Sequence, residues 1–75
     1  MKVTAKQVHK FAEKIEELNM LLQEMIDAKE EVLDNANSAE YPNEERIEKL
    51  EGQVDILQTA FDDLENTISN LNDYE

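Results

Sequence analysis

The chain of 75 residues contains no cysteine and no tryptophan, and it has only one glycine, one proline and one histidine. Without cysteine it can form no disulfide, no thiolate metal site and no thiol nucleophile. The scarcity of glycine and proline disfavours a loop-rich or all-β domain, whereas the abundance of Glu, Leu and Lys suits long helices. A chain of this length buries little surface, so we expect one small all-α domain without a sizeable pocket.

Long uninterrupted apolar runs are also missing from the sequence. The N-terminal segment MKVTAKQVHKF lacks the apolar core of a signal peptide. The most apolar run, LNMLLQEMI at residues 18 to 26, is too short and too interrupted to cross a bilayer. We therefore expect a soluble cytoplasmic protein with no membrane partner.

Basic residues are scarce, because seven Lys and Arg stand against nineteen Asp and Glu, which gives a net charge of −12. This balance argues against direct binding of nucleic acid or of anionic lipid. Residues 1 to 29 hold five bases and five acids, so all of the net charge lies in residues 30 to 75, with fourteen acids and two bases. The later part of the chain is therefore where we expect contacts with a basic partner.

Apolar residues recur at alternating intervals of three and four in both halves of the chain, a pattern typical of helices with a coiled-coil seam. The first seam comprises Val8, Phe11, Ile15, Leu18, Leu22, Met25, Val32 and Ala36, interrupted by Lys29. The second seam comprises Ile47, Leu50, Val54, Leu57, Phe61, Leu64, Ile68 and Leu71. The two seams predict a helix over residues 5 to 36 and another over residues 44 to 73.

Local signals mark the ends of both predicted helices. Thr4 and Gln7 have the spacing of a capping box, and Asn43 is a good N-cap for the second helix. Pro42 lacks a backbone N–H and disfavours helical geometry at Tyr41, so we expect a break instead of one continuous helix. Residues 37 to 42 then form a short turn.

An antiparallel pairing brings the two seams into register, with Val32 level with Ile47 and Val8 level with Leu71. We therefore predict an all-α fold for residues 1 to 75: an antiparallel two-helix coiled-coil hairpin that dimerises into a four-helix bundle. Acidic residues gather at the turn end of this hairpin, and we call them the acidic pole. Its members are Glu30, Glu31, Asp34, Glu40, Glu44, Glu45, Glu48, Glu51 and Asp55.

The apolar surface is wider than a two-helix seam requires. The additional residues predict an oligomer or docking face made of Leu21, Ile26, Leu33, Ile56 and Ala60. Two uses of this face remain open, a homodimeric four-helix bundle and the docking of a different protein. A hairpin of this size has a one-sided core, so we expect a second copy or a partner to stabilise it.

No residue pattern predicts catalysis. His9 lies at an outward position without a second ligand, and neighbouring acids such as Glu16 and Glu17 lack the enclosed pocket that acid–base chemistry needs. The sequence has no Gly-rich phosphate loop, no Glu-x-x-His motif and no EF-hand spacing. We therefore expect a protein that is not an enzyme and that uses no metal or cofactor.

The run NEERIEKLEGQVDILQTAFDDLENTI, preceded by IEELNMLLQEMIDAKEEVLDNA, resembles the very small acidic helical proteins of bacteriophages and mobile elements of Gram-positive bacteria. The resemblance implies a phage accessory protein in the cytoplasm of a bacterial host cell. Proteins of that class act by binding and blocking a host factor. We therefore predict a non-catalytic protein-binding module, an inhibitor of a host nucleic-acid enzyme or defence complex that acts through its acidic surface. The alternative is a structural or scaffolding coiled-coil module that acts through self-assembly.

Overall fold

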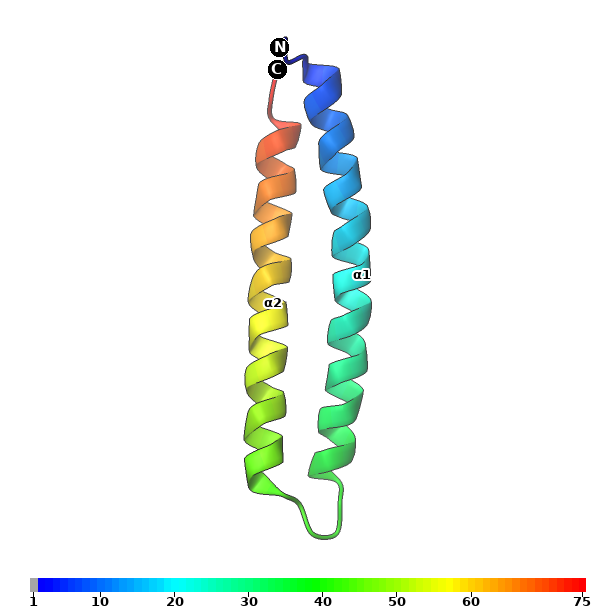
Figure 1. The fold of residues 1–75 in the computed structure, drawn as a ribbon, viewed down its shortest axis with the longest axis vertical. Helices are drawn as coiled ribbons and strands as arrows, with labels where there is room; N and C mark the ends of the chain where they lie inside the picture. Colours follow the sequence, from blue (N-terminus) through cyan, green and yellow to red (C-terminus); the bar gives the residue numbers. More distant parts are fainter. Residues whose placement is uncertain (1) are drawn as a thin grey trace.

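Two long antiparallel helices make up the computed structural model, which describes residues 2–75. Helix α1 spans Ala5–Asn37 and helix α2 spans Glu44–Asn72. The helices lie side by side, with both termini at one end of the molecule and the connection at the other (Figure 1). The hairpin measures 59 × 18 × 15 Å, and residues 2–75 contain no strand. The predicted all-α hairpin is therefore confirmed.

Side chains outside each helix cap its first turn. At α1 the Gln7 N–H donates to Thr4 Oγ1 at 3.2 Å, and the Thr4 N–H donates to Gln7 Oε1 at 3.0 Å, which confirms the capping box. At α2 the Arg46 N–H donates to Asn43 Oδ1 at 3.1 Å. Helix α1 ends at Asn37, one residue later than expected, so the connection consists of residues 38–43.

Hydrogen bonds between the helices show how they are aligned. Lys29 Nζ donates to Gln53 Oε1 at 3.1 Å, and Asn19 Nδ2 donates to the main-chain oxygen of Phe61 at 3.3 Å. Both partners lie within one helical turn of the residue that the seam alignment places opposite. The long stem of Lys29 also explains how a charged residue fits a half-buried position, because its ammonium group reaches the edge of the interface.

The two helices use their seams differently. Helix α2 packs through its predicted seam, in which Leu50 is buried and the other members are half-buried. In α1 the buried residues are Ala12, Asn19 and Ile26. Only one of them, Asn19, is polar, and it lies in the middle of the contact between the helices.

The prediction that Phe11, Leu18, Met25 and Val32 belong to the hairpin core is wrong. Phe11 is 58% exposed, Leu18 61% and Met25 56%, and Val32 also faces solvent. The residues that directly follow them face α2 instead, namely Ala12, Asn19, Ile26 and Leu33. At 100° per residue the change corresponds to a rotation of α1 by about 50° about its axis. Both seams have the same alternation of three and four, so periodicity alone does not distinguish them.

Replacement of Ile26 by alanine should lower the free energy of unfolding by about 2–4 kcal/mol. This side chain is 1% exposed, so its loss leaves a cavity between the helices. Urea denaturation followed by far-ultraviolet circular dichroism measures the change. The matched control is Met20→Ala on the exposed part of the same helix, which should alter the free energy by less than about 0.5 kcal/mol. Equal stability of the two variants would contradict the observed seam.

Candidate interaction surfaces

One flank of α1, beside the surface that packs on α2, carries an exposed apolar stripe. Its members are Phe11, Leu18, Leu21, Met25, Ala28 and Val32. They recur at intervals of three, four or seven residues and so lie along one side of the helix. Lys14 occupies the one position that would complete the pattern. The stripe is about 32 Å long, and an apolar surface of this extent is typical of an interaction site.

Part of α2 lies on the same side of the hairpin as this stripe. In an antiparallel pair, the residues that directly precede the seam positions of either helix point to the same side. Every stripe residue directly precedes a buried or half-buried residue of α1. On α2 the same rule selects Arg46, Lys49, Gln53, Ile56, Ala60, Asp63, Thr67 and Asn70. We call the stripe, together with Lys14 and these α2 residues, the stripe side.

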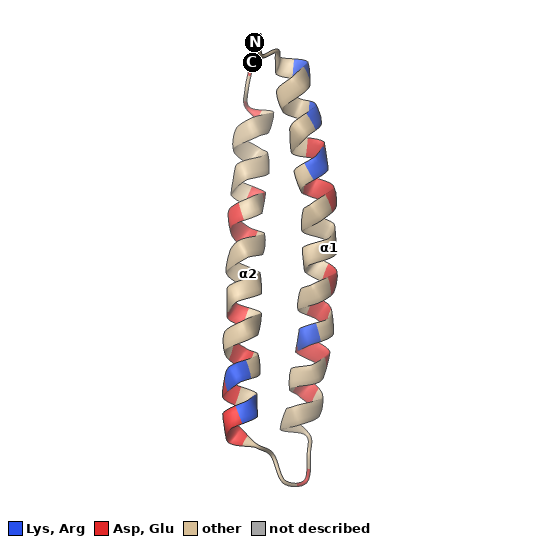
Figure 2. Ribbon diagram, in the orientation of Figure 1, with Lys and Arg blue, Asp and Glu red and all other residues tan. Residues whose placement is uncertain are grey.

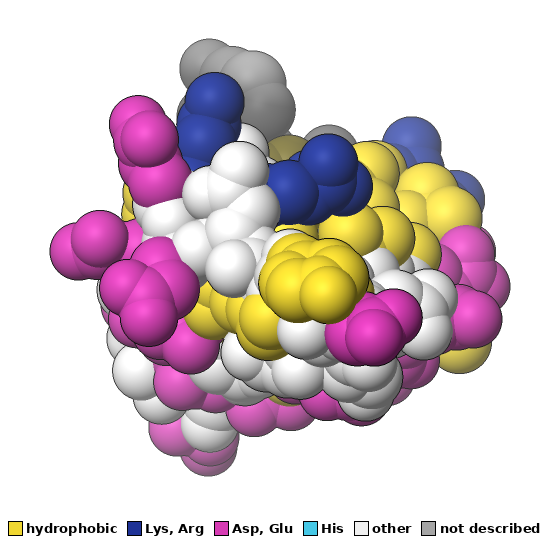
Figure 3. All heavy atoms as spheres, turned by 90° about the horizontal axis from the view of Figure 1, so that it is seen from below, with side chains coloured by type: hydrophobic (Ala, Val, Ile, Leu, Met, Phe, Trp, Pro, Cys, Tyr) yellow, Lys and Arg dark blue, Asp and Glu magenta, His cyan; other side chains and the backbone are white. Residues whose placement is uncertain are grey.

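The stripe side has a different charge balance from the rest of the chain. It carries three bases, Lys14, Arg46 and Lys49, and one acid, Asp63, although the whole chain has a net charge of −12. Seen from the turn end, apolar side chains gather in the middle and upper right of the view with basic side chains beside them, while acidic side chains lie to the left, below and to the right of them (Figure 3). A partner that reaches the stripe therefore meets an apolar strip with a weakly basic border.

The predicted acidic pole lies in the half of the rod next to the connection (Figure 2). All of its members, from Glu30 to Asp55, are exposed. They belong to different sides of both helices and to the connection, and Arg46 and Lys49 lie among them. This arrangement produces a broad negative field at one end of the molecule.

The structure brings together only part of the predicted docking face. Leu21 and Ile56 are exposed and Ala60 is half-buried, and all three belong to the stripe side. Ile26 is buried and Leu33 half-buried, because both lie in the α1 seam that packs on α2. The members that the sequence did not assign to this face are Phe11, Leu18, Met25 and Val32. Their regular spacing is visible in the sequence, but that spacing predicted that they belong to the hairpin core.

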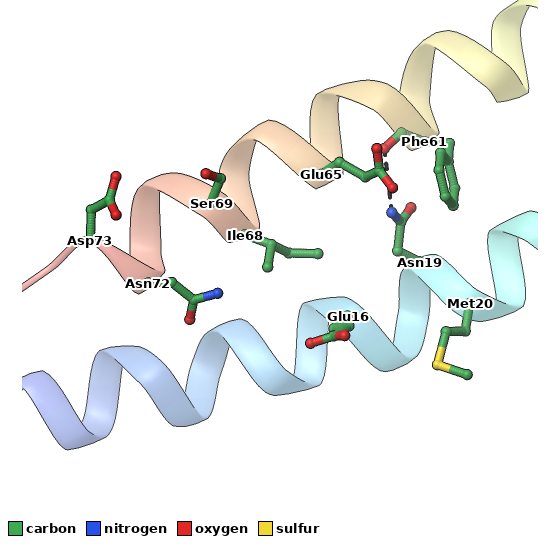
Figure 4. Close-up of a pocket in the computed structure, with 9 residues that line it drawn as sticks. All are labelled: Glu16, Asn19, Met20, Phe61, Glu65, Ile68, Ser69, Asn72 and Asp73. Atoms are coloured by element: carbon green, nitrogen blue, oxygen red, sulfur yellow. Dashed lines mark hydrogen bonds between the residues drawn. The ribbon is translucent and has the colours of Figure 1, made fainter.

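A groove of about 510 Å³ runs over Asn19 on another side of the hairpin (Figure 4). Glu16, Glu65 and Asp73 contribute carboxylates to its walls, and Phe61 contributes an apolar surface. Asn19 is 4% exposed, and its Oδ1 accepts no hydrogen bond from the described residues 2–75. The groove is open to solvent and contains no histidine, so it offers no nucleophile paired with an imidazole base.

Replacement of Asn19 by leucine should raise the free energy of unfolding by about 1–2 kcal/mol. The change removes a buried amide oxygen that has no partner in residues 2–75, and the groove leaves room for the larger side chain. The Phe61 carbonyl keeps its bond within α2. Urea denaturation measures the effect, with Asn19→Asp as a control that should destabilise the hairpin because it buries a charge. A leucine variant less stable than the parent would contradict this interpretation.

Within residues 2–75, no group of three or more His, Cys, Asp and Glu side chains is arranged to hold a metal ion. Neither described helix has an apolar segment long enough to cross a membrane. His9 is exposed, and its Nε2 lies 2.9 Å from the main-chain oxygen of Tyr74, which links the start of α1 to the C-terminal end.

No family model matches the chain, and no curated protein or solved structure is significantly similar to it. The resemblance to small acidic phage proteins therefore stays a prediction. The surfaces described above carry the functional proposal.

Proposed function

We propose that this chain is a non-catalytic protein-interaction module that packs its apolar stripe against a helix of another protein chain. The observation that carries the proposal is the exposure of large apolar side chains at regular helical spacing, with Leu18 at 61% and Leu21 at 52%. Water contact with side chains of this size is unfavourable, and a partner that covers them gains the corresponding free energy. The exposed stripe residues do not pack on α2, so the fold of the hairpin does not explain why they are apolar.

The spacing of the stripe favours a helical partner. Intervals of three and four allow each apolar side chain to enter a space between side chains of a facing helix. An amphipathic helix in the partner would bury the stripe along its full length of about 32 Å. A flat or irregular surface would contact only some of these side chains.

The acidic pole supplies a second contribution to binding. A negative field at one end of the rod attracts a basic surface and increases the rate of encounter, although it adds less to final affinity. Inhibition of a host nucleic-acid enzyme or defence complex by a phage accessory protein is one form that such binding would take. A scaffolding role through self-assembly is another, and both use the same stripe.

The proposal is tested by affinity capture from a lysate of the organism that encodes the chain. The parent chain should retain a partner that Leu18→Glu with Leu21→Glu loses, because the new carboxylates would have to be buried. Met20→Glu is the matched control, since Met20 lies between these residues in sequence but is 66% exposed on another side of α1. Capture that is identical for all three chains, or the absence of any captured protein together with a monomeric parent, would refute the proposal.

A further inference from the structure

We infer that the chain that covers the stripe is a second copy of this protein, with α1 packed antiparallel on α1 of that copy. The inference rests on the proposed function and names its partner. Three features of the stripe side support it: self-complementarity in an antiparallel arrangement, charge distribution and contact area.

Two-fold symmetry allows two ways to place one stripe side on another. With the axis parallel to the helices, α1 lies over α2 of the second copy, and the apolar stripe covers Arg46, Lys49 and Gln53. With the axis perpendicular to the helices, α1 lies over α1 and the two stripes cover each other. The first arrangement also places Leu18 and Leu21 over Ala60 and Ile56, but only the second covers apolar side chains with apolar side chains over most of the stripe.

The stripe is self-complementary in this antiparallel arrangement. When the axis passes between Leu18 and Leu21, Leu18 of one copy faces Leu21 of the other. In the same register Phe11 faces Ala28, so a large side chain meets a small one. Met25 faces Lys14, whose stem covers the thioether while its ammonium group reaches solvent. Every position from residue 11 to residue 28 then has a partner in the second copy.

The charges favour the same orientation. The antiparallel arrangement places the two acidic poles at opposite ends of the dimer, whereas a parallel one would bring them together. At the edge of the contact, Lys10 lies within about 3 Å along the axis of the level of Glu31 of the second copy. Glu17 has the same offset from Glu24 of the second copy, and Lys14 lies one turn from Glu17 and so offsets their repulsion. The stripe itself contains no acidic residue, so two such acidic molecules meet there without facing acidic residues along the centre of the α1 contact.

The area is adequate for a stable dimer. Asn19 is hydrogen-bonded to the carbonyl of Phe61, so Ala60 of α2 lies at the level of the two-fold axis, where its small side chain allows close approach. The paired positions 11 to 28 span about 26 Å, so a contact of that length and as wide as the hairpin, which measures 18 Å across, has a projected area of ~460 Å² per copy. The accessible area of a corrugated surface exceeds its projection. It therefore compares with the roughly 800 Å² per partner of standard stable interfaces.

The mass of the chain in solution tests the inference. Sedimentation equilibrium between about 1 µM and about 1 mM should show a species of twice the 8.7 kDa chain mass. Leu18→Glu with Leu21→Glu should weaken dimerisation at least about 100-fold, because the contact would then bury four carboxylates. Met20→Glu should leave it unchanged. An increase in salt from ~0.05 to ~0.5 M should strengthen the dimer by screening the repulsion between its acidic copies.

Disulfide crosslinking tests the orientation on an otherwise cysteine-free chain. A mixture of Lys14→Cys and Met25→Cys chains should give the mixed disulfide, since these positions face each other in the antiparallel register. The alternative arrangement, with α1 over α2 of the second copy, brings neither position next to position 14 or 25 of the other chain, so random collisions would give the two homodisulfides as readily as the mixed one. Circular dichroism of each variant shows that the hairpin remains folded.

The outcomes separate this inference from the proposed function. A monomeric parent, a dimer that survives Leu18→Glu with Leu21→Glu, or the absence of a preference for the mixed disulfide would overturn the inference. If the parent is monomeric but captures another protein in a stripe-dependent way, the proposed function stands and only the second copy is excluded. A dimer that dissociates with the stripe variant and forms the mixed disulfide supports both.

Discussion

The width of the apolar surface on α1 determines the rest of the structure. Around this helix, apolar residues occupy several adjacent positions of the seven-residue repeat, including those of Phe11, Ala12, Ile15 and Leu21. A single facing helix covers a seam of about two of those positions. Helix α2 is the one neighbour that the chain itself supplies, so part of this surface must face either water or another chain. The hairpin core and the exposed stripe are therefore two parts of one apolar surface on α1, which is wider than α2 alone covers.

The hairpin itself could be predicted because its determinants are local. Thr4 and Asn43 cap their helices through side chains only three residues from their partners, and Pro42 interrupts the helical pattern between them. Because the connection is short, the second helix packs antiparallel against the first. These effects depend on neighbouring residues and on hydrophobic spacing. Both are readable from sequence.

The rotation of α1 could not be predicted, because the determinants act across the hairpin. Asn19 resembles an outward-facing residue in sequence, yet it is buried and donates to the Phe61 carbonyl. Large Phe11 and Leu18 resemble core residues, yet smaller Ala12 and Asn19 take the positions between the helices. The acidic pole was predictable because charged residues remain hydrated in almost any helical arrangement. The composition of the docking face was only partly predictable, because it depended on which seam α2 covers.

Core and interface are linked through this rotation. Helix α1 can bury Ile26 or Met25 against α2, but a single facing helix cannot bury both fully. In the observed rotation Asn19 keeps its hydrogen bond to Phe61, and Leu18 and Met25 remain available to a partner. A rotation that drew Leu18 into the hairpin would break this bond and remove the stripe. A partner that covers the stripe therefore stabilises the observed core, since it binds only the rotation in which the stripe is exposed. Packing inside the hairpin and binding outside it thus depend on the same rotation of α1.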